Sequence, residues 1–291
     1  NDKIVYEREW AHNVSELKSL STAEEIIAFR RKFVMQFLEE NSLNLSEMDA
    51  IAARGMGRTG SYRHGGYLLT PEVCADCTGG HQGLFASTKI AGALSQEYGV
   101  PAYLYDVVPT DEIYDVARVS GIPNHRRRAH SHTLNCRATA RRVTEQMGLD
   151  FDNSTFIVCH MGGGMGTMCC KNGIIVETYS SEEGSFTPVR AGRIPADFLI
   201  KVYTDPKNTQ NDINRLLRKN VGLFGHLGTD NCVEIEERIR SGDKKAELVY
   251  RAMAYQLSKD IGAMATVAIG KVDAVILTGG IARSKMITDW I

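Results

Sequence analysis

A histidine and a run of three glycines follow one predicted strand, and together they suit the binding of an anion. The strand covers residues 156–159, ends at His160 and continues into Gly162, Gly163 and Gly164. Glycines let the backbone approach a ligand closely and aim its N–H groups at negative charge. A histidine at the edge of such a turn can donate to a developing negative charge. The pattern predicts a phosphate-binding cradle.

Two further strands are predicted directly after the cradle, at residues 165–170 and 174–178. They are separated by Asn172-Gly173, a pair typical of a tight hairpin turn. Cys159 and His160 are neighbours in the first strand, and successive strand residues face opposite sides of a sheet. A cysteine nucleophile activated by this histidine is therefore excluded.

The long predicted loop at residues 180–195 carries Arg190 and Arg193. Long ordered loops in compact domains are often functional, and a guanidinium group can clamp a transferring phosphoryl group. Arg190 is the candidate because the cradle precedes this loop. The alternative is an arginine in a surface ion pair.

Arg54 follows a short predicted strand, residues 49–53, and enters a G-x-G-x-x-G run at residues 55–60. A dinucleotide site would need a helix that opens at these glycines. The residues that follow contain helix breakers, so this reading is disfavoured. We expect Arg54 to lie at the strand end and to pair with an anionic substrate; a simple glycine turn is the alternative.

Two more candidates flank a helix predicted at residues 82–98. His81 precedes it and serves either as a cap or as a contact to an anion at the helix N-terminus. Asp106 follows the next predicted strand, residues 102–105, where α/β sheets place ligands; a turn residue is the alternative. Cys74 and Cys77 have metal-like spacing to His81, but a closed zinc site needs a fourth ligand that the spacing does not supply.

The C-terminal part repeats the strand–glycine pattern. A long helix is predicted at residues 246–269, and the strand at 272–278 continues into Gly279, Gly280 and Ile281. This junction suits a nucleotide, whereas the absence of G-x-x-x-x-G-K-[ST] excludes a P-loop ATPase. The sequence around 273–280 echoes that around 49–57, which predicts a duplicated α/β domain. The polar segment 150–154 predicts the boundary, giving domains 1–150 and 151–291.

Composition limits the partners. The 291 residues carry a net charge of −1, so no bulk electrostatic attraction to nucleic acid or membranes is expected. The basic run at 125–132 is too short to change this. No stretch approaches the ~18 consecutive apolar residues of a membrane span. Buried cysteines suit a cytoplasmic protein. The chain begins without methionine and stops within an apparent helix, so we expect a fragment.

Near the start of the sequence, Ser21 and Glu24 predict a capping box at the beginning of an amphipathic helix.

Four stretches resemble the butyrate kinases, a branch of the acetate kinase family in the superfamily of sugar kinases, heat-shock ATPases and actin. They are HMGGG at 160–164, PVRAG at 188–192, DE at 111–112 with DVARVSG at 115–121, and ILTGGIARSK at 276–285. The resemblance covers essentially the whole chain, and the four motifs together are far more specific than any single glycine motif.

The resemblance implies an α/β fold of two actin-like (ribonuclease H-like) domains, with ATP and Mg²⁺ in the cleft between them, and a homodimer. It implies reversible transfer of the γ-phosphoryl group of ATP to a short-chain carboxylate, butanoate foremost. The implied site residues are Arg54, Asp106, His160 and Arg190 for catalysis, His81 for the substrate, Gly162, Gly163 and Gly164 for phosphate, Gly279, Gly280 and Ile281 for adenosine, and Asp106 for Mg²⁺.

The sequence also departs from the family pattern. The family opens with a phosphate loop of the type Asn-x-Gly-Ser-Thr, and nothing of this kind precedes Ile4. The family continues past the adenosine turn to an acidic residue near the metal, whereas this chain stops at Ile291. We expect one phosphate motif and one metal ligand to be missing. Alternatives are a kinase for acetate, propionate or branched-chain acids, a nucleotide-binding relative without an acyl acceptor, and an inactive fragment.

Overall fold

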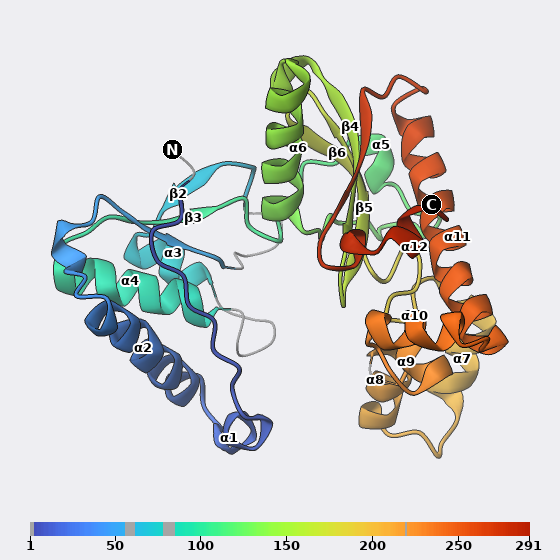
Figure 1. Ribbon diagram of the computed structural model, residues 1–291, viewed down its shortest axis with the longest axis horizontal. Coiled ribbons are helices and arrows are strands. Elements are labelled where there is room, and N and C mark those ends of the chain that lie inside the picture. Colours follow the sequence, from blue (N-terminus) through green and yellow to red (C-terminus); the bar gives the residue numbers. More distant parts are fainter. Residues whose placement is uncertain (1–2, 56–61, 78–84, 219) are drawn as a thin grey trace. The chain divides into compact units, whose positions relative to one another are not determined.

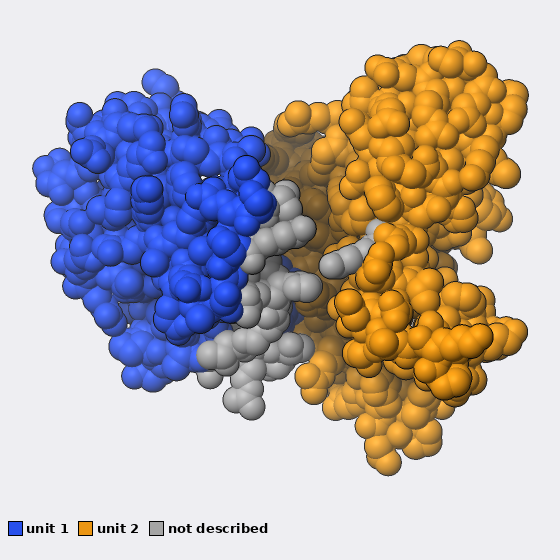
Figure 2. Space-filling model, turned by 90° about the horizontal axis from the view of Figure 1, so that it is seen from below, with its two compact units in different colours: residues 1–110 blue, residues 111–291 orange. Residues whose placement is uncertain are grey.

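The computed structural model describes residues 3–55, 62–77, 85–218 and 220–291. The chain divides into two compact units, residues 1–110 and 111–291, coloured in Figure 2. The domain boundary expected after residue 150 stays a prediction, but the compact units divide earlier. The reason is that residues 111–150 belong to the core of unit 2, where Cys136 and Ala140 are buried against the sheet.

Unit 1 contains a three-stranded sheet with the order β1-β3-β2. Strands β1 (Ile51–Ala53) and β3 (Ala102–Tyr105) are parallel, and β2 (Gly66–Leu68) is antiparallel to β3. The predicted strands at 49–53 and 102–105 are thus confirmed. Because parallel strands end at the same edge of a sheet, the residues that follow β1 and β3 lie near one another.

Helices α2 (Ala23–Glu40) and α4 (Ala86–Tyr98) pack together over a small apolar cluster that contains Ile90 and Leu94. Helix α4 ends at Gly99, which adopts φ +71°, so the predicted helix stop is confirmed. The other helices of unit 1 are α1 (Val14–Ser19), η1 (Leu45–Glu47) and α3 (Pro71–Asp76).

Unit 2 contains a four-stranded sheet with the order β6-β5-β4-β7. Strands β4 (Thr155–Met161), β5 (Met165–Lys171) and β6 (Ile174–Tyr179) form two antiparallel hairpins. The three predicted strands and the predicted hairpin between the second and third are confirmed. Asn172 and Gly173 have φ values of +52° and +75°, the backbone that a tight hairpin turn requires. Strand β7 (Ala274–Thr278) runs parallel to β4.

Helices cover both faces of this sheet, with α6 (Thr133–Met147) on one side and α11 (Lys244–Val267) on the other (Figure 1). The side chains of β4 alternate between these faces. Cys159 is buried in the cluster that contains α11, whereas His160 contacts Asn135 of α6. The predicted separation of Cys159 from His160 is therefore confirmed.

The remaining helices of unit 2 are α5 (Asp115–Arg118), η2 (Phe151–Asn153), α7 (Ala196–Thr204), α8 (Gln210–Arg218), α9 (Gly222–Leu227), α10 (Cys232–Arg240), η3 (Ile281–Arg283) and α12 (Lys285–Thr288). Residues 180–195, between β6 and α7, form the predicted long loop. Within the described ranges, every helix is too short or too polar to cross a membrane.

Candidate active site

The predicted cradle is the tight connection between β4 and β5, where Met161 pairs with Met165. A Cβ atom on Gly162 would lie 3.3 Å from Nε2 of His160, and one on Gly164 would lie 3.6 Å from Nε2 of His132. The glycines therefore leave the backbone close to two imidazole rings. This arrangement combines backbone N–H groups with histidine donors beside one turn.

Helix α6 orients His160. Nδ1 of His160 lies 3.0 Å from Oδ1 of Asn135, and this hydrogen bond joins β4 to α6. With the amide oxygen of Asn135 facing the ring, Nδ1 is the donor, and Nε2 donates as well when the ring is an imidazolium. A flipped Asn135 amide would donate to Nδ1 and leave Nε2 protonated in the neutral ring. In both states Nε2 can donate to an anion on the Gly162 side.

His132 is a site residue that the sequence did not reveal. It precedes α6, and its ring stacks on that of His160 with centroids 4.0 Å apart and planes 15° from parallel. In the sequence it belongs to the basic run 125–132, which was considered only as a possible contact to nucleic acid or membranes. The available signal was its position directly before α6.

The long loop reaches the cradle at two points. Ser181 Oγ donates to the carbonyl of Met165 at 2.6 Å and accepts from its N–H at 3.0 Å. Thr187 Oγ1 donates to the carbonyl of Gly163 at 2.7 Å. The loop and the glycine turn therefore hold each other in a fixed geometry.

Arg190 and Arg193 of this loop have different surroundings. Arg193 forms an ion pair with Asp260 of α11. Within the described part of the chain, Arg190 instead meets carbonyl oxygens: its Nη1 donates to Val189 at 3.0 Å and to Arg218 at 3.2 Å. The charge of Arg193 is thus compensated, and Arg190 is the arginine that retains positive charge for an anion.

The turn after β7 lies against the end of β4. Gly279 has φ +93°, and a Cβ atom on it would overlap the carbonyl of Met161. Only glycine allows this approach. The turn and the cradle share a cavity of about 710 Å³, a volume typical of small-ligand sites. Its lining includes Gly163, Gly280, Ile281, Ser284, Lys285, Glu236, Arg240 and the start of α10 at Asp230, Asn231, Cys232 and Val233.

Glu236, which the sequence also did not reveal, braces one wall of this cavity. Its carboxylate accepts from Tyr250 at 3.2 Å, from Ser284, and from Arg240 at 3.0 Å. Burial raises the pKa of Tyr250 far above its usual value, so the phenol stays protonated and keeps donating. These bonds tie α10 and α11 to the turn after β7.

In unit 1 the candidates follow the two parallel strands. Arg54 comes directly after β1, with an exposed side chain, and Asp106 directly after β3, with a buried one. Asp106 has φ +43°, an unusual backbone that often marks functional positions. Its Oδ1 accepts from the N–H of Gly65 at 2.7 Å. A carboxylate is a preferred donor for Mg²⁺, which typically takes one or two of them together with phosphate oxygens, so Asp106 fits this metal.

His81 lies outside the described residues. Its sequence neighbours Cys74 and Cys77 are free thiols at the end of α3, and burial raises the pKa of both. Among the residues that the structure describes, no group of three histidine, cysteine or acidic side chains is arranged to hold a metal. The structure thus adds no support for a zinc site at these cysteines.

Comparison with known proteins identifies the family. Residues 99–288 match the family model described as the acetokinase family. The chain belongs to the acetokinase family. It is 35% identical to butyrate kinase 2 of Clostridium acetobutylicum and 36% identical to a probable butyrate kinase 2 of Caldanaerobacter subterraneus subsp. tengcongensis. Each alignment covers 100% of this chain and 83% of the relative.

Solved acetokinase-type structures have the same fold. The acetate kinase of Porphyromonas gingivalis aligns with a TM-score of 0.78 at 21% identity, over 91% of this chain and 71% of that one. A propionate kinase from Francisella tularensis aligns with a TM-score of 0.74 at 18% identity, over 89% of this chain and 71% of that one. The predicted actin-like α/β fold and family resemblance are confirmed. As a member of this family, the chain is a carboxylate kinase that uses ATP.

Proposed function

We propose that this acetokinase transfers the γ-phosphoryl group of ATP reversibly to butanoate, or to a closely related short-chain acid, giving an acyl phosphate and ADP. One observation carries the proposal: Gly163 of the cradle and Gly280 of the β7 turn line the same cavity, and the glycines on either side of Gly163 lie close to two stacked histidines. The choice of butanoate is supported by the names of two relatives that match the whole of this chain, a butyrate kinase and a probable butyrate kinase.

The nucleoside and the phosphates of ATP are assigned to two different turns. We assign Gly279, Gly280 and Ile281 to the nucleoside, and Gly162, Gly163 and Gly164 to the phosphates through their backbone N–H groups. His160 donates from Nε2 to an oxygen of the transferring phosphoryl group, with the ring held by Asn135. The stacked ring of His132 keeps this imidazole in place and adds a second donor.

The reaction needs no general base. A carboxylate is already ionised at neutral pH, so one of its oxygens attacks the γ-phosphorus directly. The new bond between oxygen and phosphorus forms as the bond to the bridging oxygen breaks, and its electron pair leaves with ADP. Two anions must therefore be brought together, and positive charge supplies most of the catalysis. We assign this charge to Arg190 for the phosphoryl group and to Arg54 for the carboxylate.

Asp106 would hold Mg²⁺, and His81 would contact the acid, both carried over from the resemblance. Bound Mg²⁺ neutralises phosphate charge in such reactions. We extend the proposal to a homodimer on the same ground. The free cysteines of the described chain support a reducing, cytoplasmic location.

The test is hydroxamate-trapped acyl phosphate formation from ATP, Mg²⁺ and straight-chain acids of two to five carbons. A version of the chain extended to the length of its relatives is assayed in parallel. We expect activity that peaks at butanoate; one methylene contributes only ~1–3 kcal/mol of discrimination, so neighbouring acids retain activity. ATP binding without acyl phosphate in either version would contradict the proposal and favour a nucleotide-binding relative.

A further inference from the structure

Residues 184–193, the part of the long loop that carries Arg190, form a closed loop. The N–H of Arg193 donates to the carbonyl of Gly184 at 3.0 Å and joins the two ends. Gly192 has φ +68°, and a Cβ atom on it would lie 2.5 Å from the backbone nitrogen of Phe186. The interior of the loop is therefore filled by its own backbone.

Helix α11 anchors this closed loop through two side chains. Asp260 has a side chain that is only 1% exposed, and it accepts from the N–H of Ser185 at 2.7 Å while pairing with the guanidinium of Arg193. One turn earlier on α11, Gln256 accepts from the N–H of Phe186 at 3.3 Å. A buried carboxylate without its cation is strongly unfavourable, so Asp260 holds Arg193 against the helix.

The loop transmits this anchoring to the cradle. Thr187 donates its hydroxyl to the carbonyl of Gly163 at 2.7 Å, and its N–H to the carbonyl of Arg190 at 3.0 Å. One residue thus fixes both the backbone of Arg190 and the middle of the glycine turn. Neither Asp260 nor Arg193 takes a direct part in the proposed chemistry.

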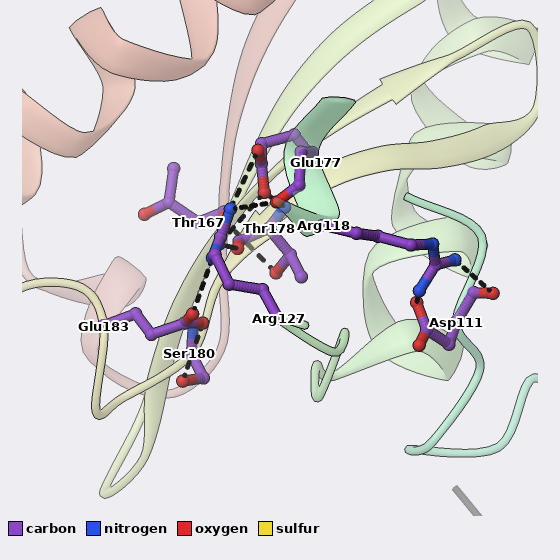
Figure 3. A network of polar contacts seen from close by, with 9 residues as sticks. Asp111, Arg118, Arg127, Thr167, Glu177, Thr178, Ser180 and Glu183 are labelled. Carbon is purple, nitrogen blue, oxygen red and sulfur yellow. Dashed lines mark hydrogen bonds and ion pairs between the residues drawn. The ribbon is translucent and has the colours of Figure 1, made fainter. Parts of the chain in front are cut away.

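A second arginine, Arg127, secures the stem of the same loop (Figure 3). Nε of Arg127 donates to Glu183 at 3.0 Å, and the two terminal nitrogens donate to both carboxylate oxygens of Glu177 at 3.2 Å. The side chains of Arg127 and Arg193 both approach the ring of Tyr179, at 5.8 and 5.0 Å. The stem is therefore also held by ion pairs that do not involve Asp260, and loss of the Asp260 pair should loosen residues 184–193 more than the stem.

We propose that Asp260 is a positioning residue for phosphoryl transfer. It acts through Arg193 to hold Arg190 and the Gly163 carbonyl in fixed positions relative to each other. The inference rests on the proposed function, because it concerns the same site. It differs from a purely structural role in one measurable way. Loss of a purely structural ion pair changes only the free energy of unfolding, whereas loss of a positioning pair also lowers kcat in the fully folded enzyme.

The test compares Arg193→Gln, Arg193→Lys and Asp260→Asn with the unaltered chain. Arg193→Gln leaves the buried Asp260 carboxylate without its cation and should destabilise the fold. Arg193→Lys keeps a cation beside it and Asp260→Asn removes the buried charge, so the melting temperature of every variant is measured first. Arg251→Gln is the matched control: it removes an exposed arginine that pairs with Glu247 on the same helix and has no contact with the loop. All variants are assayed well below their melting temperatures for kcat and for the KM of ATP.

We expect Arg193→Gln to lower kcat roughly 10- to 100-fold, the range produced by a misplacement of about 1 Å, with little change in the KM of ATP. Arg193→Lys should recover part of kcat, and Arg251→Gln should match the unaltered chain. Amide exchange in 184–193 should quicken in Arg193→Gln and in Asp260→Asn, but not in Arg251→Gln. An active unaltered chain with unchanged kcat in Arg193→Gln would overturn this inference alone. An unaltered chain that forms no acyl phosphate would overturn the proposed function and this inference with it.

Discussion

Arg190 and Arg193 are three residues apart in one loop, yet their surroundings assign them different roles. Arg193 forms an ion pair with the buried Asp260, whereas Arg190 donates hydrogen bonds to backbone carbonyls. A guanidinium that meets only neutral acceptors keeps its full charge for an incoming anion. The sequence could name both arginines as candidates, but it could not choose between them because the deciding carboxylate lies far along the chain.

Replacement of Arg190 by glutamine should lower kcat roughly 10²- to 10³-fold, the usual cost of removing one donor that stabilises developing charge. Its melting temperature should stay unchanged, because among the described residues the side chain makes two hydrogen bonds, both to carbonyls. Steady-state kinetics and thermal unfolding measure both. Arg218→Gln is the matched control, since that arginine is exposed and pairs with Glu182. Near-normal turnover in Arg190→Gln would remove Arg190 from the proposed mechanism.

The turn after β7 offers two adjacent glycines that the structure distinguishes. Gly279 has φ +93° and touches the end of β4, whereas Gly280 has φ −61° and a Cβ atom on it would meet nothing within 4 Å. Gly279→Ala should therefore destabilise the protein by ~1–3 kcal/mol from backbone strain and weaken ATP binding by displacing the turn. Gly280→Ala should leave the free energy of unfolding close to that of the unaltered chain.

Urea unfolding and ATP titration of the two variants test this pair. Equal free energies of unfolding for Gly279→Ala and Gly280→Ala would mean that the turn does not depend on its close contact with Met161. The adenosine assignment would then lose its structural basis.

Local patterns predicted the elements well where one short-range rule acts. The Asn172-Gly173 turn and the alternating side chains of β4 follow from backbone geometry alone. The capping box at the start of α2 was wrong by one residue: Thr22 and Glu25 form it, where Ser21 and Glu24 were expected. The sequence pattern allows both registers, because a Glu also stands three residues after Thr22. Strand β2 and helix α3 were missed because both are short.

Long-range partners were beyond the sequence. His132 reaches the cradle because α6 packs on the face of the sheet to which His160 points. Glu236 and Asp260 become site supports because α10 and α11 pack behind the two glycine turns. These contacts join residues that are distant in sequence, and no spacing rule connects them. The family resemblance supplied what periodicity could not, namely which glycines belong together.

At the scale of the whole molecule, the sheet of unit 2 buries thiols in both of its apolar layers. Cys159 and Cys169 lie in the layer with α11, and Cys136 and Cys170 in the layer with α6. Burial raises the pKa of Cys159 from 9.0 to about 12 and that of Cys169 to about 11. Cys159 and Cys169 are therefore protonated packing groups at neutral pH.

Stability should consequently fall in alkaline solution. Below pH 9 the thiol of Cys159 is protonated in both folded and unfolded chains, and its contribution is complete. Between pH 9 and about 12 only the unfolded chain releases this proton, so the unfolded state gains by up to ~1.4 kcal/mol per pH unit for each such thiol. Urea unfolding at pH 8, 9 and 10 should show this decline. Cys159→Ala should start less stable because of its cavity, yet decline less steeply than the unaltered chain. Parallel curves for the two proteins would contradict this prediction, because they would mean that the Cys159 thiol has the same pKa in the folded and unfolded chains.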